Sequence, residues 1–230
     1  MQNMKGSKKT VVIVAGGKGL RMKSDIPKQF LALEAKPVLM HSIEAFYSYD
    51  PDMDVVVVLP ELQVAFWENL CREHCFSIPC RIVNGGETRF HSVKNALEVL
   101  RDTQWVAVHD AVRPLVDVET IARCFDAAEK HRAVVPVIEA VDSMRQLLQD
   151  GTSRSVDRAA YRLVQTPQVF AADLLKKAYE QDFSPLFTDD ASVVEACGED
   201  VILVEGAREN IKITTPMDVA LAESIIRNRC

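Results

Sequence analysis

Short apolar runs alternate with segments of helical periodicity along most of the chain, and this alternation limits the possible folds more than any other feature. VVVVL (55–59) and WVAV (105–108) are apolar throughout, as strands buried on both faces are. Between them, the apolar residues of SVKNALEVL (92–100) fall on one helical stripe. This alternation predicts an α/β fold, with a mostly parallel sheet covered by helices on both sides. In such sheets, ligands bind beyond the carboxyl ends of the strands.

Residues 139–163 interrupt this pattern. Stretches with a strand-like alternation of side chains lie on either side of Asp150-Gly151, a dipeptide typical of tight hairpin turns. An isolated hairpin is marginally stable in water, so we expect it to pack on another surface, such as that of a second copy of the chain. We therefore predict one domain over residues 1–230, in which 139–163 form a β-arm for dimerisation.

The α/β pattern resumes after the arm. TDDASVVEACG (188–198) is typical of a helix that ends at Gly198, since glycine is common just beyond helix C-termini. The runs DVILVEG (200–206) and NIKIT (210–214) continue the alternation. A last helix is expected to begin at Pro216, because proline suits the first position of a helix.

Composition and charge exclude several function classes. The 230 residues carry a formal net charge of −6, which argues against a general nucleic-acid binder. No apolar stretch approaches the roughly 18 residues of a membrane span, and the first ten residues lack the apolar core of a signal peptide. The six cysteines form no C-x-x-C pair, which favours free thiols over a structural metal site. We expect a cytoplasmic protein that binds neither nucleic acid nor membranes.

The first strand leads into AGGKGLRM (15–22), which brings glycines and cations together. Gly16, Gly17 and Gly19 allow backbone N–H groups to approach a ligand closely, as in loops that hold phosphates. Arg21 and Lys28 follow, and two cations beside such a loop suggest a polyphosphate ligand. The alternative interpretation is a structural turn with two solvated surface cations.

A dinucleotide-binding oxidoreductase fits this loop poorly. The G-x-G-x-x-G pattern would require a third glycine where Met22 stands. The next strand ends near Leu59, about 40 residues on, whereas a ribose-binding acid is expected after about 20. The spacing of a Walker A loop is also absent. A non-catalytic nucleotide sensor would be expected to keep the glycines and lose the cations, which are present here.

Several further motifs follow in order along nearly the whole chain. They are IPKQF, NGGETRFHSVKNAL, VHDAVRP, DRAAYRLVQTPQVF, TDDAS and ENIKITTPMD. Together with AGGKGLRM, they resemble the 2-C-methyl-D-erythritol 4-phosphate cytidylyltransferase family of sugar nucleotidyltransferases. The resemblance implies a three-layer, Rossmann-like nucleotidyltransferase fold and a homodimer built by the arm. It also implies Mg²⁺-dependent transfer of a cytidylyl group from CTP to a sugar-alcohol phosphate, with release of pyrophosphate.

The chemistry of such a transfer suits the cations of this chain. A phosphate oxygen attacks the α-phosphorus of CTP, so two anions must approach while charge builds on the phosphorus, and positioning with electrostatic stabilisation suffices. By resemblance, Arg21 and Lys28 would stabilise the pentavalent phosphorus, and Arg158 and Lys212 would hold the attacking phosphate.

The resemblance also implies a nucleotide site and a metal ligand. CTP would contact Ala15, Gly16, Gly17, Gly19, Gly86, Glu87, Ser92 and Asp110. Asp110 ends a buried strand, and a carboxylate there suits Mg²⁺, although it could instead cap the following turn. We interpret His109 as a hydrogen-bonded structural residue, and leave open whether Arg113 orders its loop or contacts substrate. Gly16 stands where many relatives carry alanine.

The acceptor pocket is expected to offer hydroxyl groups and cations to a polyol phosphate. By resemblance its residues are Ser143, Arg158, Thr166, Thr188 and Lys212. Because Ser143 and Arg158 belong to the arm, they could act in the partner chain of a dimer. Asp189 and Asp190 could serve this pocket or only the first turn of a helix. The motifs favour methylerythritol phosphate as acceptor, with ribitol 5-phosphate as the alternative.

Overall fold

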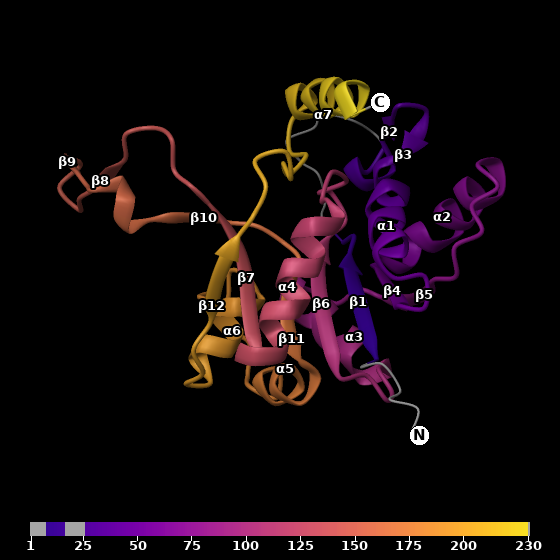
Figure 1. Cartoon of the computed structure of the whole chain (residues 1–230), viewed down its shortest axis with the longest axis horizontal. Helices are drawn as coiled ribbons and strands as arrows, with labels where there is room; N and C mark the ends of the chain where they lie inside the picture. The colour runs from indigo at the N-terminus through magenta and orange to yellow at the C-terminus, as the bar shows by residue number, and fades with distance from the viewer. Residues whose placement is uncertain (1–7, 17–25, 230) are drawn as a thin grey trace.

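A mostly parallel sheet forms the centre of the computed structural model, which describes residues 8–16 and 26–229 (Figure 1). Its strands are β1 (Lys9–Val14), β4 (Asp54–Leu59), β5 (Arg81–Asn84), β6 (Trp105–Asp110), β7 (Ala133–Glu139), β10 (Arg162–Val164), β11 (Gln168–Ala171) and β12 (Ile202–Glu205). The order is β10-β7-β11-β6-β1-β4-β5, and β12 also pairs with β7. Parallel pairs join β6 to β1, β1 to β4, β4 to β5 and β7 to β12.

Helices cover both faces of this sheet. They are α1 (Val38–Tyr49), α2 (Glu61–Glu73), α3 (Arg89–Val99), α4 (Val118–His131), α5 (Ala172–Ala178), α6 (Asp190–Ala196) and α7 (Pro216–Arg229). On one face α1 packs against α4, where the rings of Tyr49 and Phe125 stack with their centroids 5.6 Å apart. Figure 1 shows α4 in front of the sheet and α3 behind it. The predicted α/β fold is therefore confirmed.

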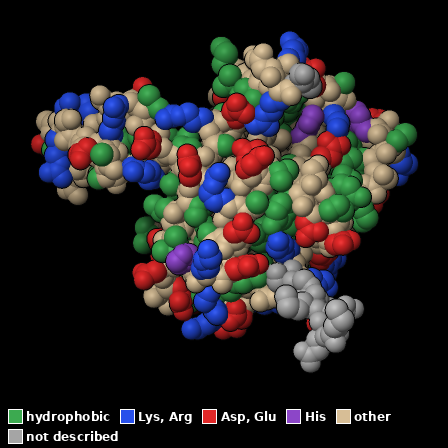
Figure 2. All heavy atoms as spheres, viewed as in Figure 1, with side chains coloured by type: hydrophobic (Ala, Val, Ile, Leu, Met, Phe, Trp, Pro, Cys, Tyr) green, Lys and Arg blue, Asp and Glu red, His purple; other side chains and the backbone are tan. Residues whose placement is uncertain are grey.

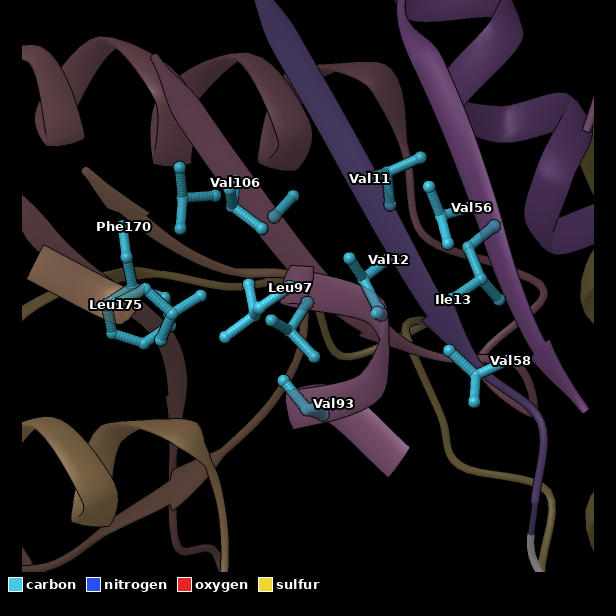
Figure 3. Close-up of a cluster of buried hydrophobic side chains, with 14 of the residues drawn as sticks. Val11, Val12, Ile13, Val56, Val58, Val93, Leu97, Val106, Phe170 and Leu175 are labelled. Carbon is cyan, nitrogen blue, oxygen red and sulfur yellow. The ribbon is translucent and has the colours of Figure 1, made fainter. Parts of the chain in front are cut away.

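The main hydrophobic core lies between the sheet and these helices. Figure 3 shows Val12 of β1 and Val106 of β6 near Val93 and Leu97, which project from α3. These four side chains are at most 4% exposed. Burying a side chain of this size stabilises the fold by about 1.5–3 kcal/mol, so the apolar runs fix the sheet and hold its carboxyl edge in place.

The predicted arm is a protruding hairpin (Figures 1 and 2). Its strands β8 (Arg145–Leu147) and β9 (Ser153–Ser155) pair antiparallel. The turn between them uses Gly151 at φ +83°, a backbone conformation that glycine adopts readily. Asp150 accepts a hydrogen bond from the backbone N–H of Thr152, with an N–O distance of 2.9 Å. The hairpin turn expected from Asp150-Gly151 is therefore present.

Two segments differ from the sequence-based expectation. β11, which the sequence did not predict as a strand, runs antiparallel between β6 and β7 within the mostly parallel sheet. The run NIKIT (210–214) is not a strand. It crosses the carboxyl edge of the sheet as irregular chain, with the N–H of Ile213 bonded to the carbonyl of Val112 at 2.8 Å. A two-strand hairpin, β2 (Ala32–Leu33) and β3 (Lys36–Pro37), precedes α1.

The described residues contain no group of three or more His, Cys, Asp or Glu side chains that could hold a metal ion. Five of the six cysteines lie among these residues, and all five are free thiols. None of the helices in the described ranges combines the length and the apolar character that crossing a bilayer requires.

Candidate active site

A pocket of about 350 Å³ opens at the carboxyl edge of the sheet. It is lined by Val14, Ala15, Gly16, Lys28, Gln29, Gly86, Glu87, Thr88, Arg89, Ser92, Asp110, Val112 and Lys212. These residues come from the ends of β1 and β6, the start of α3, the turn at Lys28 and the segment before α7. We call this the first pocket. Its position agrees with the rule that α/β sheets bind ligands beyond the carboxyl ends of their strands.

A second pocket of about 290 Å³ adjoins the first. It is lined by Arg89, Asp110, Arg113, Val164, Gln165, Thr166, Gln168, Thr188, Asp189 and Lys212. Arg89, Asp110 and Lys212 line both pockets, and we call these three residues the shared wall. Two ligands that occupied the two pockets would therefore meet at this wall.

Asp110 is the carboxylate at the centre of the shared wall. Its Oδ2 accepts a hydrogen bond from Lys212 Nζ at 2.6 Å, and its Oδ1 lies 3.6 Å from Arg89 Nε. Arg113 Nε lies 3.9 Å from Oδ2. Burial by itself raises the pKa of the Asp110 carboxyl, but Arg89 and then Lys212 more than offset this and hold that pKa well below its usual range. Asp110 therefore stays ionised at physiological pH.

Arg89 is held by the buried carboxylate of Asp190. Its Nη1 and Nη2 donate to the two oxygens of Asp190 at 3.0 and 2.6 Å, and the Asp190 side chain is fully buried. The hydroxyl of Tyr179 donates to the same carboxylate at 2.7 Å. Asp189 instead caps α6 by accepting from the Ser192 N–H at 2.9 Å. Of the two roles that the sequence left open, Asp190 has the first-turn position of α6 and lines neither pocket, whereas Asp189 lines the second pocket as well as capping the helix.

His109 determines the direction in which the Thr166 hydroxyl donates its hydrogen. His109 Nε2 lies 3.1 Å from the carbonyl of Arg113, which can only accept, so Nε2 carries the proton. Burial lowers the pKa of His109 to about 4, so the ring is neutral at pH 7 and its Nδ1 is an acceptor. Thr166 Oγ1, at 3.0 Å, must therefore donate to Nδ1, while it accepts from the Asp110 N–H at 3.1 Å.

Thr166 therefore differs from its expected role as a hydroxyl donor to a polyol. It does line the second pocket. Its single hydroxyl hydrogen is used by His109, so only a remaining lone pair could face a ligand. The structural role expected for His109 agrees with these contacts, because the ring orients the group that holds the Asp110 backbone.

The same burial predicts acid sensitivity. The unfolded chain binds a proton on His109 near pH 6.5, whereas the folded chain does so only near pH 4. Stability should therefore fall as the pH drops through this window, by about 3 kcal/mol at its lower end. Urea unfolding of the wild type and His109→Gln between pH 7 and 4 measures this dependence, with exposed His131→Gln as control. Equal pH slopes in the wild type and His109→Gln would contradict the assignment.

The loop before α3 is packed tightly against that helix. Ser92 Oγ accepts from the Gly86 N–H at 3.1 Å and donates to the carbonyl of Thr88 at 2.9 Å. A Cβ added to Gly86 would lie 2.4 Å from the Cβ of His91, so the close approach requires glycine. Ser92 thus shapes the wall of the first pocket, and its hydroxyl hydrogen is already used within the loop.

Gln29 was not singled out by the sequence, although it lies in the IPKQF motif. Its Nε2 donates to the carbonyl of Ala15 and to Gln63 Oε1, both at 2.7 Å. Its Oε1 is buried and has no hydrogen-bond partner among the described residues, and Gln29 lines the first pocket. Gln29 therefore fixes the end of β1, where the glycine loop begins.

The structure brings most of the predicted site residues together. The first pocket contains the predicted residues Ala15, Gly16, Lys28, Gly86, Glu87, Ser92, Asp110 and Lys212. The second contains the predicted residues Thr166, Thr188 and, again, Asp110 and Lys212. Ser143 and Arg158 are exposed on or beside the arm and line neither pocket, and Arg158 donates to the carbonyl of Val141. Gly17, Gly19 and Arg21 lie outside the described residues.

Arg113, whose role the sequence left open, has a structural function here. Its Nη1 donates to the carbonyl of Asn210 at 2.7 Å, and its Nη2 donates to the carbonyl of Val164 at 3.3 Å. It also lines the second pocket. Arg113 therefore ties the loop after β6 to the segment that carries Lys212.

The donor set at the shared wall can be compared with what Mg²⁺ requires. Among the described residues of the first pocket, Asp110 and Glu87 supply the carboxylates. Mg²⁺ in phosphate-processing sites is commonly bound through one or two carboxylates together with the phosphates of the substrate. The ionised Asp110 fits that arrangement, provided that Lys212 releases its Oδ2.

The chain resembles known proteins over almost its full length. A family model described as 2-C-methyl-D-erythritol 4-phosphate cytidylyltransferase matches residues 9–228. The protein of that name from Bacteroides thetaiotaomicron is 56% identical over 219 residues, covering 95% of this chain and 100% of the relative. The protein of that name from Bacteroides fragilis is 57% identical over 218 residues, covering 95% and 99%.

Solved structures agree. The crystal structure of 2-C-methyl-D-erythritol 4-phosphate cytidylyltransferase from Thermus thermophilus matches with a TM-score of 0.74 and 32% identity, covering 96% of this chain and 99% of that one. The 4-diphosphocytidyl-2C-methyl-D-erythritol synthase from Anaerococcus prevotii matches with a TM-score of 0.82 and 25% identity, covering 96% and 97%.

The fold, the two adjoining pockets and these similarities define a nucleotidyltransferase. The chain belongs to the 2-C-methyl-D-erythritol 4-phosphate cytidylyltransferase family. The family and the enzyme class predicted from the ordered motifs are therefore confirmed.

Proposed function

We propose that the protein transfers the cytidylyl group of CTP to 2-C-methyl-D-erythritol 4-phosphate, with release of pyrophosphate, as a step of isoprenoid biosynthesis. The products are 4-diphosphocytidyl-2-C-methyl-D-erythritol and pyrophosphate. The observation that carries this proposal is the pair of pockets with its shared wall of Arg89, Asp110 and Lys212. A bond between two anionic reactants must form where their sites meet, and cations are needed at that place.

The first pocket suits the nucleotide. Gly16, just after β1, and Lys28, in a later turn, both line this pocket, where backbone and a cation can face phosphates. Gly86 and Glu87 line the same pocket and would supply polar groups for the base and ribose. The second pocket, which both Thr188 and Lys212 line, then receives the polyol phosphate.

In the proposed reaction, an oxygen of the acceptor phosphate forms a bond to the α-phosphorus of CTP. The bond from that phosphorus to the oxygen bridging the α- and β-phosphates breaks, and the electron pair leaves with pyrophosphate. Lys28 and Lys212 reduce the repulsion between the reactants and stabilise the charge that builds at the phosphorus. Arg21, outside the described residues, and Arg158, on the arm, would complete this set of cations.

Mg²⁺ is part of the proposal, with Asp110 as the protein ligand. When bound, the ion would neutralise phosphate charge and polarise the oxygens of the nucleotide. The chain itself keeps Asp110 ionised and in place through Arg89 and through the Thr166 hydroxyl on its backbone N–H.

Methylerythritol phosphate is favoured over ribitol 5-phosphate as acceptor. The family model matches residues 9–228, and the Bacteroides relatives named above share more than half of their residues with this chain. The cytoplasmic location expected from the sequence belongs to the same proposal.

A single assay tests this function. Purified protein is incubated with Mg²⁺, each of the four nucleoside triphosphates and a panel of polyol phosphates, and pyrophosphate release is measured. We expect release with CTP and methylerythritol phosphate, and none when Mg²⁺ is removed by EDTA. Preferential use of ribitol 5-phosphate would overturn the assigned acceptor.

We further propose that the chain is one domain whose arm builds a homodimer. The arm exposes apolar side chains that a partner could cover, and Figure 2 shows them interspersed with charged groups. Val141 is 58% exposed, Leu147 is 81% exposed and Leu163 is 49% exposed. Apolar groups clustered on such an extension favour association with another protein surface.

A hybrid-dimer experiment tests whether the arm acts in the partner chain. An Arg158→Ala chain and a Lys28→Ala chain, each inactive by itself, should together regain activity, because one site of each heterodimer then has both residues intact. Pyrophosphate release from purified, differently tagged heterodimers measures this recovery. If proven heterodimers stay inactive, the arm does not act in the partner.

A further inference from the structure

Arg89 lies between the carboxylates of Asp110 and Asp190 and lines both pockets, and how it is itself held in place has a consequence for the reaction. Its Nε lies 3.6 Å from Asp110 Oδ1, and both of its Nη atoms bond to Asp190. The planar fork of arginine can hold one carboxylate with two parallel bonds, which fixes the orientation of the group as well as its charge.

Asp190 and Tyr179 hold Arg89 in one geometry. The Asp190 side chain is fully buried and accepts three hydrogen bonds, two from Arg89 and one from the Tyr179 hydroxyl. Burial raises the pKa of Tyr179 well above its usual range, so the hydroxyl stays a donor. The Tyr179 ring stacks on Phe90 with the ring centroids 4.7 Å apart, which fixes the position of its hydroxyl.

A gain in folding stability does not explain the ion pair between Arg89 and Asp190. Removing two charges from water is costly, and replacing a buried ion pair by apolar residues is often neutral or stabilising. Arg89 is also not fully enclosed, because 30% of its side chain remains exposed, and the residue lines the two pockets. The arrangement is better explained by what it does to the shared wall.

We propose that Arg89, clamped by Asp190 and Tyr179, is a positioning residue that fixes the Asp110 carboxylate at the wall shared by the nucleotide and acceptor pockets. Lys212 approaches Oδ2 of Asp110, and Arg89 approaches Oδ1 from the other side. Oδ2 is thus held by a hydrogen bond from Lys212, and Oδ1 faces the Arg89 guanidinium at ion-pair distance. The inference rests on the proposed function for its catalytic meaning, but its structural content can be tested without substrate.

Three variants separate this role from a structural one. Tyr179→Phe keeps the stacked ring and removes only the hydroxyl, Asp190→Asn weakens the clamp, and Arg89→Lys keeps the charge but cannot replace the bidentate contact. The control variants are Arg81→Lys and Asp54→Asn. They alter an ion pair between the first residues of β5 and β4, at the edge of the sheet opposite the pockets.

Steady-state kinetics with CTP and methylerythritol phosphate, together with thermal unfolding, give the first readout. Because the wall serves both pockets, we expect Arg89→Lys to raise both KM values and to lower kcat/KM by about 10²-fold, the cost of a displacement of about 1 Å. The loss in kcat/KM should be smaller in Asp190→Asn than in Arg89→Lys, and smallest in Tyr179→Phe. The control variants should lose thermal stability without a change in either KM. Unchanged KM values in Arg89→Lys, or a rise in only one of them, would overturn the proposal.

A crystal structure of ligand-free Asp190→Asn gives the second readout and does not depend on the reaction. We expect the Arg89 guanidinium to move away from Asp110 Oδ1, and the Asp110 carboxylate, then held by Lys212 alone, to change its orientation. If the three side chains of the shared wall keep their positions in that variant, the clamp does not position Asp110 and the inference is wrong. A wild-type enzyme that makes no product would overturn the proposed function, while this structure would still decide the role of the clamp.

Discussion

Replacing Lys212 by methionine is expected to lower kcat by about 10²- to 10³-fold, the usual cost of losing one group that stabilises developing charge. Methionine keeps much of the length of the side chain and removes its positive charge. Lys212 lines both pockets, and its Nζ lies 2.6 Å from Asp110 Oδ2. The charge is therefore lost at the point where the two anions would meet. Pyrophosphate release under saturating substrates measures the effect.

Lys36→Met is the matched control for this variant. Lys36 Nζ lies 2.7 Å from a carboxylate oxygen of Glu44, and its side chain is 37% exposed, compared with 42% for Lys212. It lines neither the first nor the second pocket. Lys36→Met should keep kcat close to the wild-type value. Equal and small losses in the two variants would show that the charge of Lys212 has no special part in the reaction.

Gly86→Ala is expected to weaken CTP binding by about 10²-fold, since a shift of about 1 Å at a binding group can have that cost. The new Cβ would lie 2.4 Å from the Cβ of His91 and 2.9 Å from its backbone carbonyl carbon. Real Cβ atoms do not approach other atoms so closely, and the backbone of α3 cannot rotate away as a flexible side chain would. The loop must therefore move into or away from the first pocket. Isothermal titration with CTP and Mg²⁺ measures the affinity.

Gly16→Ala provides the contrast within the same pocket. The nearest atom to a Cβ at Gly16 is Ser92 Oγ at 3.9 Å, an ordinary contact distance. CTP affinity should therefore change little. A loss in Gly16→Ala as large as that in Gly86→Ala would mean that crowding against His91 is not the reason for glycine at position 86.

The sequence predicted those parts of the fold that depend on local periodicity. The apolar run at 55–59 and the helical stripe at 92–100 report burial directly, so the parallel sheet and its helices follow from them. The start of α7 at Pro216 and the arm turn at Gly151 are likewise local backbone effects. β11 was missed because a four-residue strand carries little periodicity, and its place is decided by pairing with β6 and β7.

The sequence predicted most of the residues that line the site, but not the hydrogen bonds and ion pairs between them. Ordered motifs named Asp110 and Lys212, but no pattern shows that they bond to each other across 102 residues. Arg89 directly follows the N-cap of α3, where a surface arginine would look the same, and its partner Asp190 resembles an ordinary first-turn acid. These roles arise only when two helix starts are packed together, which is a tertiary effect.

The arm is connected to the reaction centre through the backbone. Its returning strand β10 pairs with β7, and the chain then reaches Thr166, whose hydroxyl accepts from the N–H of Asp110. A partner subunit that pulled or twisted the arm would thus act on a strand that ends beside the carboxylate. If the arm builds the proposed homodimer, assembly and chemistry are linked by one short stretch of covalent chain, and a loosely seated dimer would be expected to turn over slowly even with every reactive group present.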